Sequence, residues 1–191
     1  MKSVAVFCGA AMGSEPELSK EVVKLVYLLA KHNIELIYGG GKVGIMGLVA
    51  DTALRCHCKI VGVIPDFLID RELAHPALSE LIVVKSFNER KEAIYKRADA
   101  FILLPGGIGS LDEFFDALNQ MHVGLLSKQF GILNSMNYYS PILMQLHKAT
   151  ELAFMKPQMY DMIKVGSTAE SLIEEILNSE PSKINRWMEV D

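Results

Sequence analysis

The sequence predicts a single-domain α/β protein with a doubly wound, Rossmann-like sheet that is mostly parallel and has about seven strands. Short aliphatic and β-branched runs alternate with helical patterns along the chain. The runs are nearly continuous in apolar residues, as expected for strands that helices cover on both faces. Since strand–helix–strand units join through right-handed crossovers, this alternation favours one parallel sheet. A length of 191 residues fits one domain over residues 1–191, with residues 179–191 as a C-terminal tail.

Seven apolar runs are the predicted strands. In chain order they are Ser3–Cys8, Ile34–Tyr38, Lys59–Ile64, Leu81–Lys85, Ala100–Leu104, Phe130–Leu133 and Met162–Val165. Ligands of such sheets bind beyond the carboxyl ends of the strands, near the point where the strand order reverses. The loops that follow the strands are therefore the expected place of the functional site.

Apolar stripes with a period of 3.6 residues predict helices that pack on the sheet. The stripes are Leu18, Val22, Leu25, Val26 and Leu29; Leu111, Phe114, Phe115 and Leu118; and Leu172, Ile173, Ile176 and Leu177. The longest irregular stretch, Asp66–Ser79, is interpreted as a lid or a surface that faces a partner. The tail is polar, and Trp187 is expected to dock it.

Composition and charge exclude several classes of function. Half of the residues are hydrophobic and 22% are charged, which is a globular balance. The net charge of −4 is spread over interspersed signs, so neither nucleic acid nor an acidic membrane is an expected partner. No apolar run approaches the roughly 18 residues of a membrane span.

Cysteine usage and the first residues bear on the compartment. Three cysteines, Cys8, Cys56 and Cys58, are too few for a disulfide framework and fit a reducing environment. Residues 1–13 could pass for a short signal peptide, but a buried strand, a turn and an amphipathic helix fit them better. We expect a cytoplasmic protein.

Three glycine-rich loops follow predicted strands. They are Cys8–Gly13, Gly39–Gly47 and Pro105–Ser110. Glycine lets the backbone approach a phosphate closely. The start of the helix that follows offers unpaired N–H groups and a partial positive charge. Three such loops in one chain predict a phosphorylated small-molecule ligand.

Two common nucleotide-binding motifs fit less well. Gly39-x-Gly41-x-x-Gly44 matches the dinucleotide fingerprint in form, and Asp66 lies about 20 residues further on. However, this loop follows the second strand rather than the first, and Asp66 lies beyond the end of the next strand, so NAD(P) is the weaker interpretation. The Gly-Lys-Ser/Thr tripeptide of an ATP-hydrolysing P-loop does not occur in the sequence.

Charged residues stand next to two predicted helix starts. Ser86-x-x-Glu89 has the spacing of a capping box, which predicts a helix from Ser86. Arg90 and Lys91 then lie near a positive helix end, either as a solvated basic face or because an anionic ligand offsets their charge. Ser110-x-x-Glu113 is a second capping box. Glu113 either caps its helix or, beside the phosphate loop, has a catalytic or ribose-binding role.

Two other chemistries are not expected. Cys56-His57-Cys58 lacks the spacing of a zinc half-site, so we predict no metal site. Gly-x-Ser-x-Gly does not occur, which argues against a serine hydrolase.

Several blocks of the sequence together match a known pattern. Pro105-Gly106-Gly107-Ile108-Gly109-Ser110-Leu111-Asp112-Glu113 is similar to the Pro-Gly-Gly-x-Gly-Thr-x-x-Glu signature of the Lonely Guy family. The other matching blocks are Tyr38–Gly47, Val63-Ile64-Pro65, Glu72-Leu73-Ala74-His75, Glu89-Arg90-Lys91, Gln120 and Lys128–Asn134. The resemblance spans about Val4 to Ala153, which is most of the chain.

The sequence also departs from the family pattern in three places. Ser110 replaces the usual Thr and keeps the hydroxyl group. Ala10 and Ala11 replace serines, and Phe87-Asn88 replaces a common Met-His pair. The reaction type is little affected by these changes, whereas the preference for a base depends on them.

The resemblance implies a cytokinin riboside 5′-monophosphate phosphoribohydrolase, a type of enzyme long labelled lysine decarboxylase. Such an enzyme hydrolyses the N-glycosidic bond of AMP or N6-substituted AMP to a free base and ribose 5-phosphate, with no cofactor. It would act as a homodimer in which the partner lends part of the pocket.

The resemblance also implies roles for individual residues. The backbone of Gly106, Gly107 and Gly109 and the Ser110 hydroxyl would hold the 5′-phosphate. Arg90 and Glu113 would be catalytic, with Arg90 positioning the substrate and keeping Glu113 ionised. Further contacts to the nucleotide would come from Gly9, Gly40, Gly41 and Lys91.

Two rival functions stay open at this point. One is a carrier of a phosphorylated cofactor such as molybdenum cofactor, which would bind its ligand and release it unchanged. The other is a pyridoxal-phosphate decarboxylase, although no lysine stands in a recognisable pyridoxal site. Release of free base from AMP separates the hydrolase from both.

Overall fold

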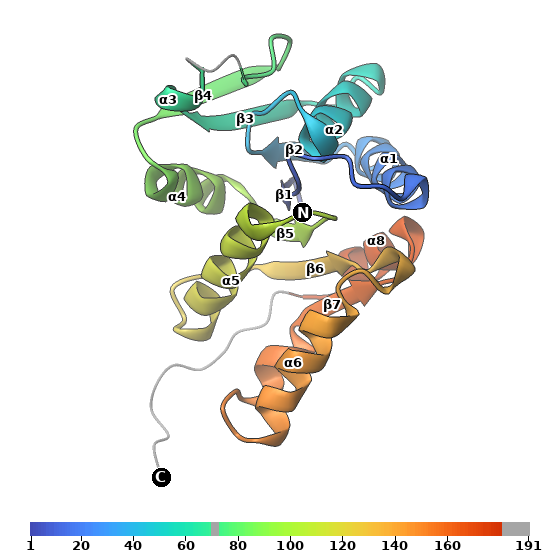
Figure 1. The fold of residues 1–191 in the computed structure, drawn as a ribbon, viewed down its shortest axis with the longest axis vertical. Helices are drawn as coiled ribbons and strands as arrows, with labels where there is room; N and C mark the ends of the chain where they lie inside the picture. Colours follow the sequence, from blue (N-terminus) through green and yellow to red (C-terminus); the bar gives the residue numbers. More distant parts are fainter. Residues whose placement is uncertain (70–72, 181–191) are drawn as a thin grey trace.

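The protein forms a seven-stranded parallel sheet in the computed structural model, which describes residues 1–69 and 73–180 (Figure 1). The strands are β1 (Ser3–Phe7), β2 (Glu35–Tyr38), β3 (Ile60–Pro65), β4 (Glu80–Val84), β5 (Ala100–Leu103), β6 (Gln129–Leu133) and β7 (Ile163–Gly166). They lie in the order β4-β3-β2-β1-β5-β6-β7, and every neighbouring pair is parallel. All seven predicted strands are confirmed, each end within one residue of its predicted position.

Helices cover both faces of the sheet (Figure 1). Their bounds are α1 (Pro16–Lys31), α2 (Gly44–Arg55), α3 (Asp66–Ile69), α4 (Phe87–Arg97), α5 (Ile108–His122), α6 (Ser140–Glu151), α7 (Pro157–Asp161) and α8 (Ala169–Asn178), with a 3-10 turn over Ser135–Asn137. One hydrophobic core joins α1, α2 and α8 to the sheet, and a second joins α4, α5, α6 and α7 to the opposite face. This arrangement confirms the doubly wound α/β prediction. Among the described residues, no helix is long and apolar enough to cross a membrane.

The strand order reverses at β1, which pairs with β2 on one side and with β5 on the other. The chain after β1 and the chain after β5 therefore turn toward opposite halves of the sheet and open a crevice between them. The two loops are joined at its floor, where the Gly9 N–H donates to the Pro105 carbonyl at 3.1 Å.

Two of the predicted apolar stripes extend too far. All five residues of the first stripe are buried, but Phe115 is 44% exposed and Leu177 is 37% exposed. Each follows a buried neighbour, Phe114 or Ile176, and a step of about 100° around a helix turns the next side chain away from the sheet.

The irregular stretch after β3 is fastened to the second glycine loop. Lys42 N donates to the Leu73 carbonyl at 2.9 Å, and His75 N donates to the Gly40 carbonyl at 2.9 Å. The imidazole of His75 also pairs with Asp51 on α2 at 3.2 Å. Glu72 lies outside the described residues, as do Trp187 and its expected docking.

Candidate active site

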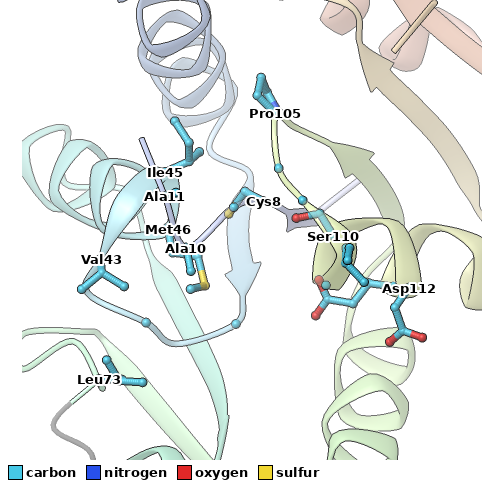
Figure 2. Close-up of a pocket in the computed structure, with 18 of the residues that line it drawn as sticks. Cys8, Ala10, Ala11, Val43, Ile45, Met46, Leu73, Pro105, Ser110 and Asp112 are labelled. Atoms are coloured by element: carbon cyan, nitrogen blue, oxygen red, sulfur yellow. The ribbon is translucent and has the colours of Figure 1, made fainter. Parts of the chain in front are cut away.

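A pocket of about 830 Å³ lies at the reversal of strand order. Figure 2 shows Val43, Ala10 and Met46 on one side of it, Ser110 and Asp112 on the other, and Cys8 between them. The glycine loops after β1, β2 and β5 all contribute to the lining, together with Arg90 and Lys91 from α4. The structure thus brings the sequence-predicted loops and charged residues to one place.

Of the helix starts beside these loops, that of α5 remains open to a ligand. At the start of α2, the N–H groups of Ile45 and Met46 donate to the Ala11 and Gly9 carbonyls at 3.4 and 3.1 Å. Helix α1 begins with Pro16, which has no N–H. Within the described residues, the N–H groups of Gly109 and Ser110 at the start of α5 find no such carbonyl. The start of α5 is therefore the helix end in this pocket whose N–H groups are available to an anion.

The predicted capping box at Ser110 is wrong. Helix α5 begins two residues earlier, at Ile108, with Gly107 as its N-cap, so Ser110 and Glu113 are both inside the helix. Glycine is tolerated as an N-cap almost as well as Ser or Thr, so Gly107 can open the helix before Ser110 is reached. The box at Ser86 is half confirmed: the Ser86 hydroxyl accepts from Glu89 N at 3.2 Å, but the Glu89 carboxylate accepts from Lys85 N instead of Ser86 N.

Arg90 and Glu113 form a buried ion pair at the wall of the pocket. The Arg90 Nη2 to Glu113 Oε1 distance is 3.1 Å, and the side chains are 12% and 11% exposed. The guanidinium lies against Gly39, where a Cβ atom would stand 1.9 Å from Nη2, so a side chain at this position would displace the guanidinium. The solvated basic face considered for Arg90 and Lys91 is therefore wrong.

Burial controls the protonation of Glu113. Removal from water raises the pKa of its carboxyl group, and the opposing charge of Arg90 offsets this only in part. Arg90 lowers the pKa of Glu113, as expected, but the cost of desolvation is the larger effect and the net shift is upward. Burial also raises the pKa of the neighbouring Cys8 thiol, which keeps that group neutral.

Two polar atoms in the pocket wall are buried without a hydrogen-bond partner among the described residues: Arg90 Nε and Ser110 Oγ. Buried polar atoms in folded proteins nearly always have a partner, and an unpaired one costs about 1–3 kcal/mol. Both atoms belong to residues that line the pocket, so the pair indicates a polar ligand between α4 and α5.

Lys91 is held by the protein itself. Its ammonium group lies 3.2 Å from Asp116 and 3.4 Å from Asp112, both on α5. Asp116 also accepts from Tyr95 and Gln120, at 2.8 and 2.9 Å. These contacts join α4 to α5 directly beside the Arg90–Glu113 pair.

The predicted contact glycines take different places. Gly41, Gly106, Gly107 and Gly109 line the pocket. Gly9 lines it as well, but its N–H group is bonded to Pro105. Gly40 is buried below the lining with φ +76°, against the Ile64 side chain.

Several lining residues were not predicted as site residues, among them Gly39 and Phe87, which were named above only in a loop and in a departure from the family pattern, and Tyr138, which was not named. The Phe87 ring lies 5.9 Å from the Arg90 guanidinium carbon and packs edge-to-face on Phe67. Tyr138 follows β6, whose carboxyl end lies at the same edge of the sheet as that of β5. Because ligands bind beyond the carboxyl ends of the strands, the position of Tyr138 after β6 could have marked it as a candidate pocket residue.

Metal ligation has no support in the described part of the chain, where no group of three or more His, Cys, Asp or Glu side chains is placed to hold an ion.

Comparison with solved structures identifies proteins of the same fold. The molybdenum cofactor binding protein of Rippkaea orientalis superposes with a TM-score of 0.70 at 23% identity, covering 92% of this chain and 95% of that one. The molybdenum cofactor carrier protein of Chlamydomonas reinhardtii gives a TM-score of 0.68 at 16% identity, covering 93% of this chain and 99% of that one. At these identities the likeness shows the fold alone.

Sequence comparison is more specific. The family model described as "Possible lysine decarboxylase" matches residues 46–176. The cytokinin riboside 5′-monophosphate phosphoribohydrolase of Rhodococcoides fascians is 38% identical, over 92% of this chain and 89% of that protein. One of the same name from Arabidopsis thaliana is 34% identical, over 100% of this chain and 90% of that protein. With these matches over nearly its whole length, the chain belongs to the Lonely Guy family of cytokinin riboside 5′-monophosphate phosphoribohydrolases.

Proposed function

We propose that this protein hydrolyses the N-glycosidic bond of a nucleoside 5′-monophosphate and releases the free base and ribose 5-phosphate. The observation that carries the proposal is the buried Arg90–Glu113 pair, which lies one helical turn from the open start of α5. A site for phosphate and a carboxyl group suited to proton transfer thus stand side by side. The names of the relatives support the same activity.

The 5′-phosphate is assigned to the start of α5. Its N–H groups at Ile108, Gly109 and Ser110 and the positive end of the helix dipole favour an anion there. The buried Ser110 hydroxyl supplies one further donor, and the phosphate supplies the partner that this hydroxyl lacks.

The ribose then lies against Arg90 and Glu113, where the reaction takes place. Cleavage of an N-glycosidic bond passes through a cation-like ribosyl group, which a carboxylate stabilises. A carboxyl group whose pKa is raised by burial is also a better proton donor and acceptor for this step than an exposed one. Glu113 takes a proton from water as the oxygen bonds to C1′, and returns a proton to the departing base. Arg90 fixes the orientation of the carboxylate.

The base is assigned to the apolar end of the pocket. This end is lined by Met46, Ile64, Leu68, Leu73 and Phe87. It suits a purine ring and an apolar substituent on its exocyclic nitrogen. We propose both AMP and N6-substituted AMP as substrates on this basis.

The test is product analysis on matched pairs of nucleotides and nucleosides. AMP and N6-isopentenyl-AMP are incubated with the protein, and the free base and ribose 5-phosphate are separated by chromatography. Adenosine and its N6-isopentenyl derivative serve as controls that lack the phosphate. We expect release of base from the nucleotides and at least a hundredfold lower kcat/KM with the nucleosides, because energy from a remote group is used at the reacting centre. Equal turnover of both would contradict the assignment.

A cofactor carrier is the second candidate, since solved carriers share this fold. A carrier would bind AMP and return it intact, so the same chromatogram decides between the two. The Arg90–Glu113 pair supports the hydrolase, because a pure binding site has no need for a buried carboxyl group close to a bound phosphate.

We also propose that the protein is a homodimer and that it is located in the cytoplasm. Apolar side chains surround the pocket mouth, with Ile108 87% exposed and Phe87 51% exposed, and a partner subunit would cover such a surface. The three thiols Cys8, Cys56 and Cys58 are unpaired, as in a reducing compartment. Light scattering should give twice the chain mass of 21.2 kDa.

A further inference from the structure

The backbone carbonyl groups of residues 104–107, at the start of the phosphate loop, all accept hydrogen bonds from the protein itself. Leu104 O accepts from the Tyr139 hydroxyl at 2.7 Å, and Pro105 O accepts from Gly9 N at 3.1 Å. Gly106 O accepts from the Tyr138 hydroxyl at 2.8 Å, and Gly107 O accepts from Leu111 N at 3.1 Å. Four consecutive carbonyls of this loop are therefore fixed in direction.

The contact of Tyr138 determines where one N–H group points. The Gly106–Gly107 peptide is trans, so its C=O and N–H bonds point in opposite directions. By holding the Gly106 carbonyl, Tyr138 turns the Gly107 N–H the other way. Because Gly107 is the N-cap of α5, this N–H joins those of the first helical turn at the anion-binding position.

The turn that carries Tyr138 has an unusual backbone. Met136 and Asn137, the two residues before it, have φ values of +54° and +59°. Asn tolerates this left-handed conformation, but other residues with a side chain rarely adopt it, and for Met136 it costs about 1 kcal/mol or more. The Asn134 side chain stabilises the turn by accepting from Tyr139 N at 2.8 Å and donating to Ser140 Oγ at 3.1 Å.

Tyr138 also differs from its neighbour in exposure. Tyr139 is 1% exposed and belongs to the core, whereas Tyr138 is 45% exposed and lines the pocket. Burial of its ring therefore does not explain the strained turn. The turn places the hydroxyl groups of both tyrosines on carbonyls of the loop after β5, and that of Tyr138 is the one that lies at the pocket.

We propose that Tyr138 is a positioning residue for the phosphate of the substrate. It acts through the Gly106–Gly107 peptide, which it holds with the N–H group of Gly107 directed at the ligand. The proposal rests on the proposed function for the identity of the ligand, a sugar 5-phosphate.

The test is Tyr138→Phe, which removes the hydroxyl and keeps the ring. Calorimetry measures the Kd for ribose 5-phosphate and, as a ligand without phosphate, for adenine. We expect the Kd for ribose 5-phosphate and the KM for AMP to rise about three- to tenfold, the effect of one hydrogen bond. The Kd for adenine should stay within twofold, and the melting temperature within about 2 °C, because water can replace the donor at this exposed carbonyl. Tyr27→Phe, on the exposed face of α1, is the matched control and should change none of these.

The possible outcomes separate the role of Tyr138 from the proposed hydrolase activity. Unchanged affinity of Tyr138→Phe for ribose 5-phosphate, or an equal loss for adenine, overturns the role of Tyr138, since a merely structural contact would affect both ligands alike. The unmodified protein is assayed with AMP in the same series. If it releases no base, the proposed function fails and the inference fails with it; if it releases base and the variant binds normally, only the inference fails.

Discussion

At the scale of single residues, the proposed reaction depends on a carboxyl group that the fold removes from water. Glu113 is 8% exposed, and its charged partner Arg90 approaches from another helix. Breaking a buried pair by truncation is costly, whereas a partner of equal shape limits the loss. The residue can therefore be tested without unfolding the protein.

Glu113→Gln should separate catalysis from stability. The amide keeps the shape, and its oxygen can still accept from Arg90, so we expect a loss of stability of about 1–2 kcal/mol at most. The negative charge and the proton-transfer group are lost, and kcat should fall at least about a hundredfold. Thermal melts and initial rates with AMP on one preparation test this. Glu92→Gln, on an exposed position of α4, is the control and should behave like the parent protein. A Glu113→Gln protein with the parent rate would leave Glu113 without a catalytic role.

The raised pKa of Glu113 predicts the acid side of the pH profile. As a base it works only when ionised, so kcat/KM should fall as pH drops through its pKa. Because burial raises that pKa above the ordinary value of 4.5, the decline should begin at higher pH than for an exposed Glu. Arg90 lowers the pKa of Glu113, so Arg90→Gln should move the titration to still higher pH. Carbon-13 NMR of the Glu113 carboxyl group follows this without relying on activity. A titration that moves to lower pH in Arg90→Gln would refute the argument.

At the scale of elements, the loop between β5 and α5 combines two demands on glycine. A Cβ atom at Gly106 would stand 2.1 Å from Ser110 Oγ and 2.8 Å from Gly9 N, so this glycine serves packing. A Cβ at Gly107 or Gly109 would meet nothing within 4 Å, so these two serve an open approach to the backbone. The two kinds of glycine should respond differently to substitution.

Gly106→Ala and Gly109→Ala form a matched pair. Gly106→Ala should lower the melting temperature by several degrees, because backbone atoms must shift to admit the methyl group. Gly109→Ala lies in the first turn of a helix, where alanine is favoured over glycine by up to about 1 kcal/mol, so stability should hold or rise. Its KM for AMP should nevertheless increase, because the methyl group narrows the approach to the helix start. An unchanged KM would remove Gly109 from the phosphate site.

The sequence allowed the strands and the position of the site to be predicted, because both follow from local patterns. Continuous apolar runs mark buried parallel strands, and the loops after them must meet at one edge of the sheet. The start of α5 was mispredicted because Ser110-x-x-Glu113 carries the local signature of a cap, whereas Gly107, also an acceptable N-cap residue, opens the helix earlier. The contacts of Lys91 with Asp112 and Asp116, and of Tyr138 with Gly106, join distant segments and have no local signature.

At the scale of the whole molecule, the pocket connects the two halves of the sheet. Its walls come from α2 on the side of β2 and from α4, α5 and the turn after β6. These elements pack into two separate cores on opposite faces. A ligand that contacts all of them at once binds only when both cores are in place, so its binding is linked to folding of the entire domain.

AMP should therefore stabilise the inactive Glu113→Gln protein against heat, with no product formed to confuse the result. At a concentration of 100 times its Kd, a ligand specific for the folded state contributes about 2.7 kcal/mol. For a chain of 191 residues this corresponds to a rise in Tm of about 5–10 °C. Adenosine at the same concentration lacks the phosphate that we assign to the start of α5, and its shift should be less than half as large. Differential scanning calorimetry with the two ligands measures the difference. Equal shifts would mean that the 5′-phosphate contributes nothing to binding, and the start of α5 would lose its assigned role.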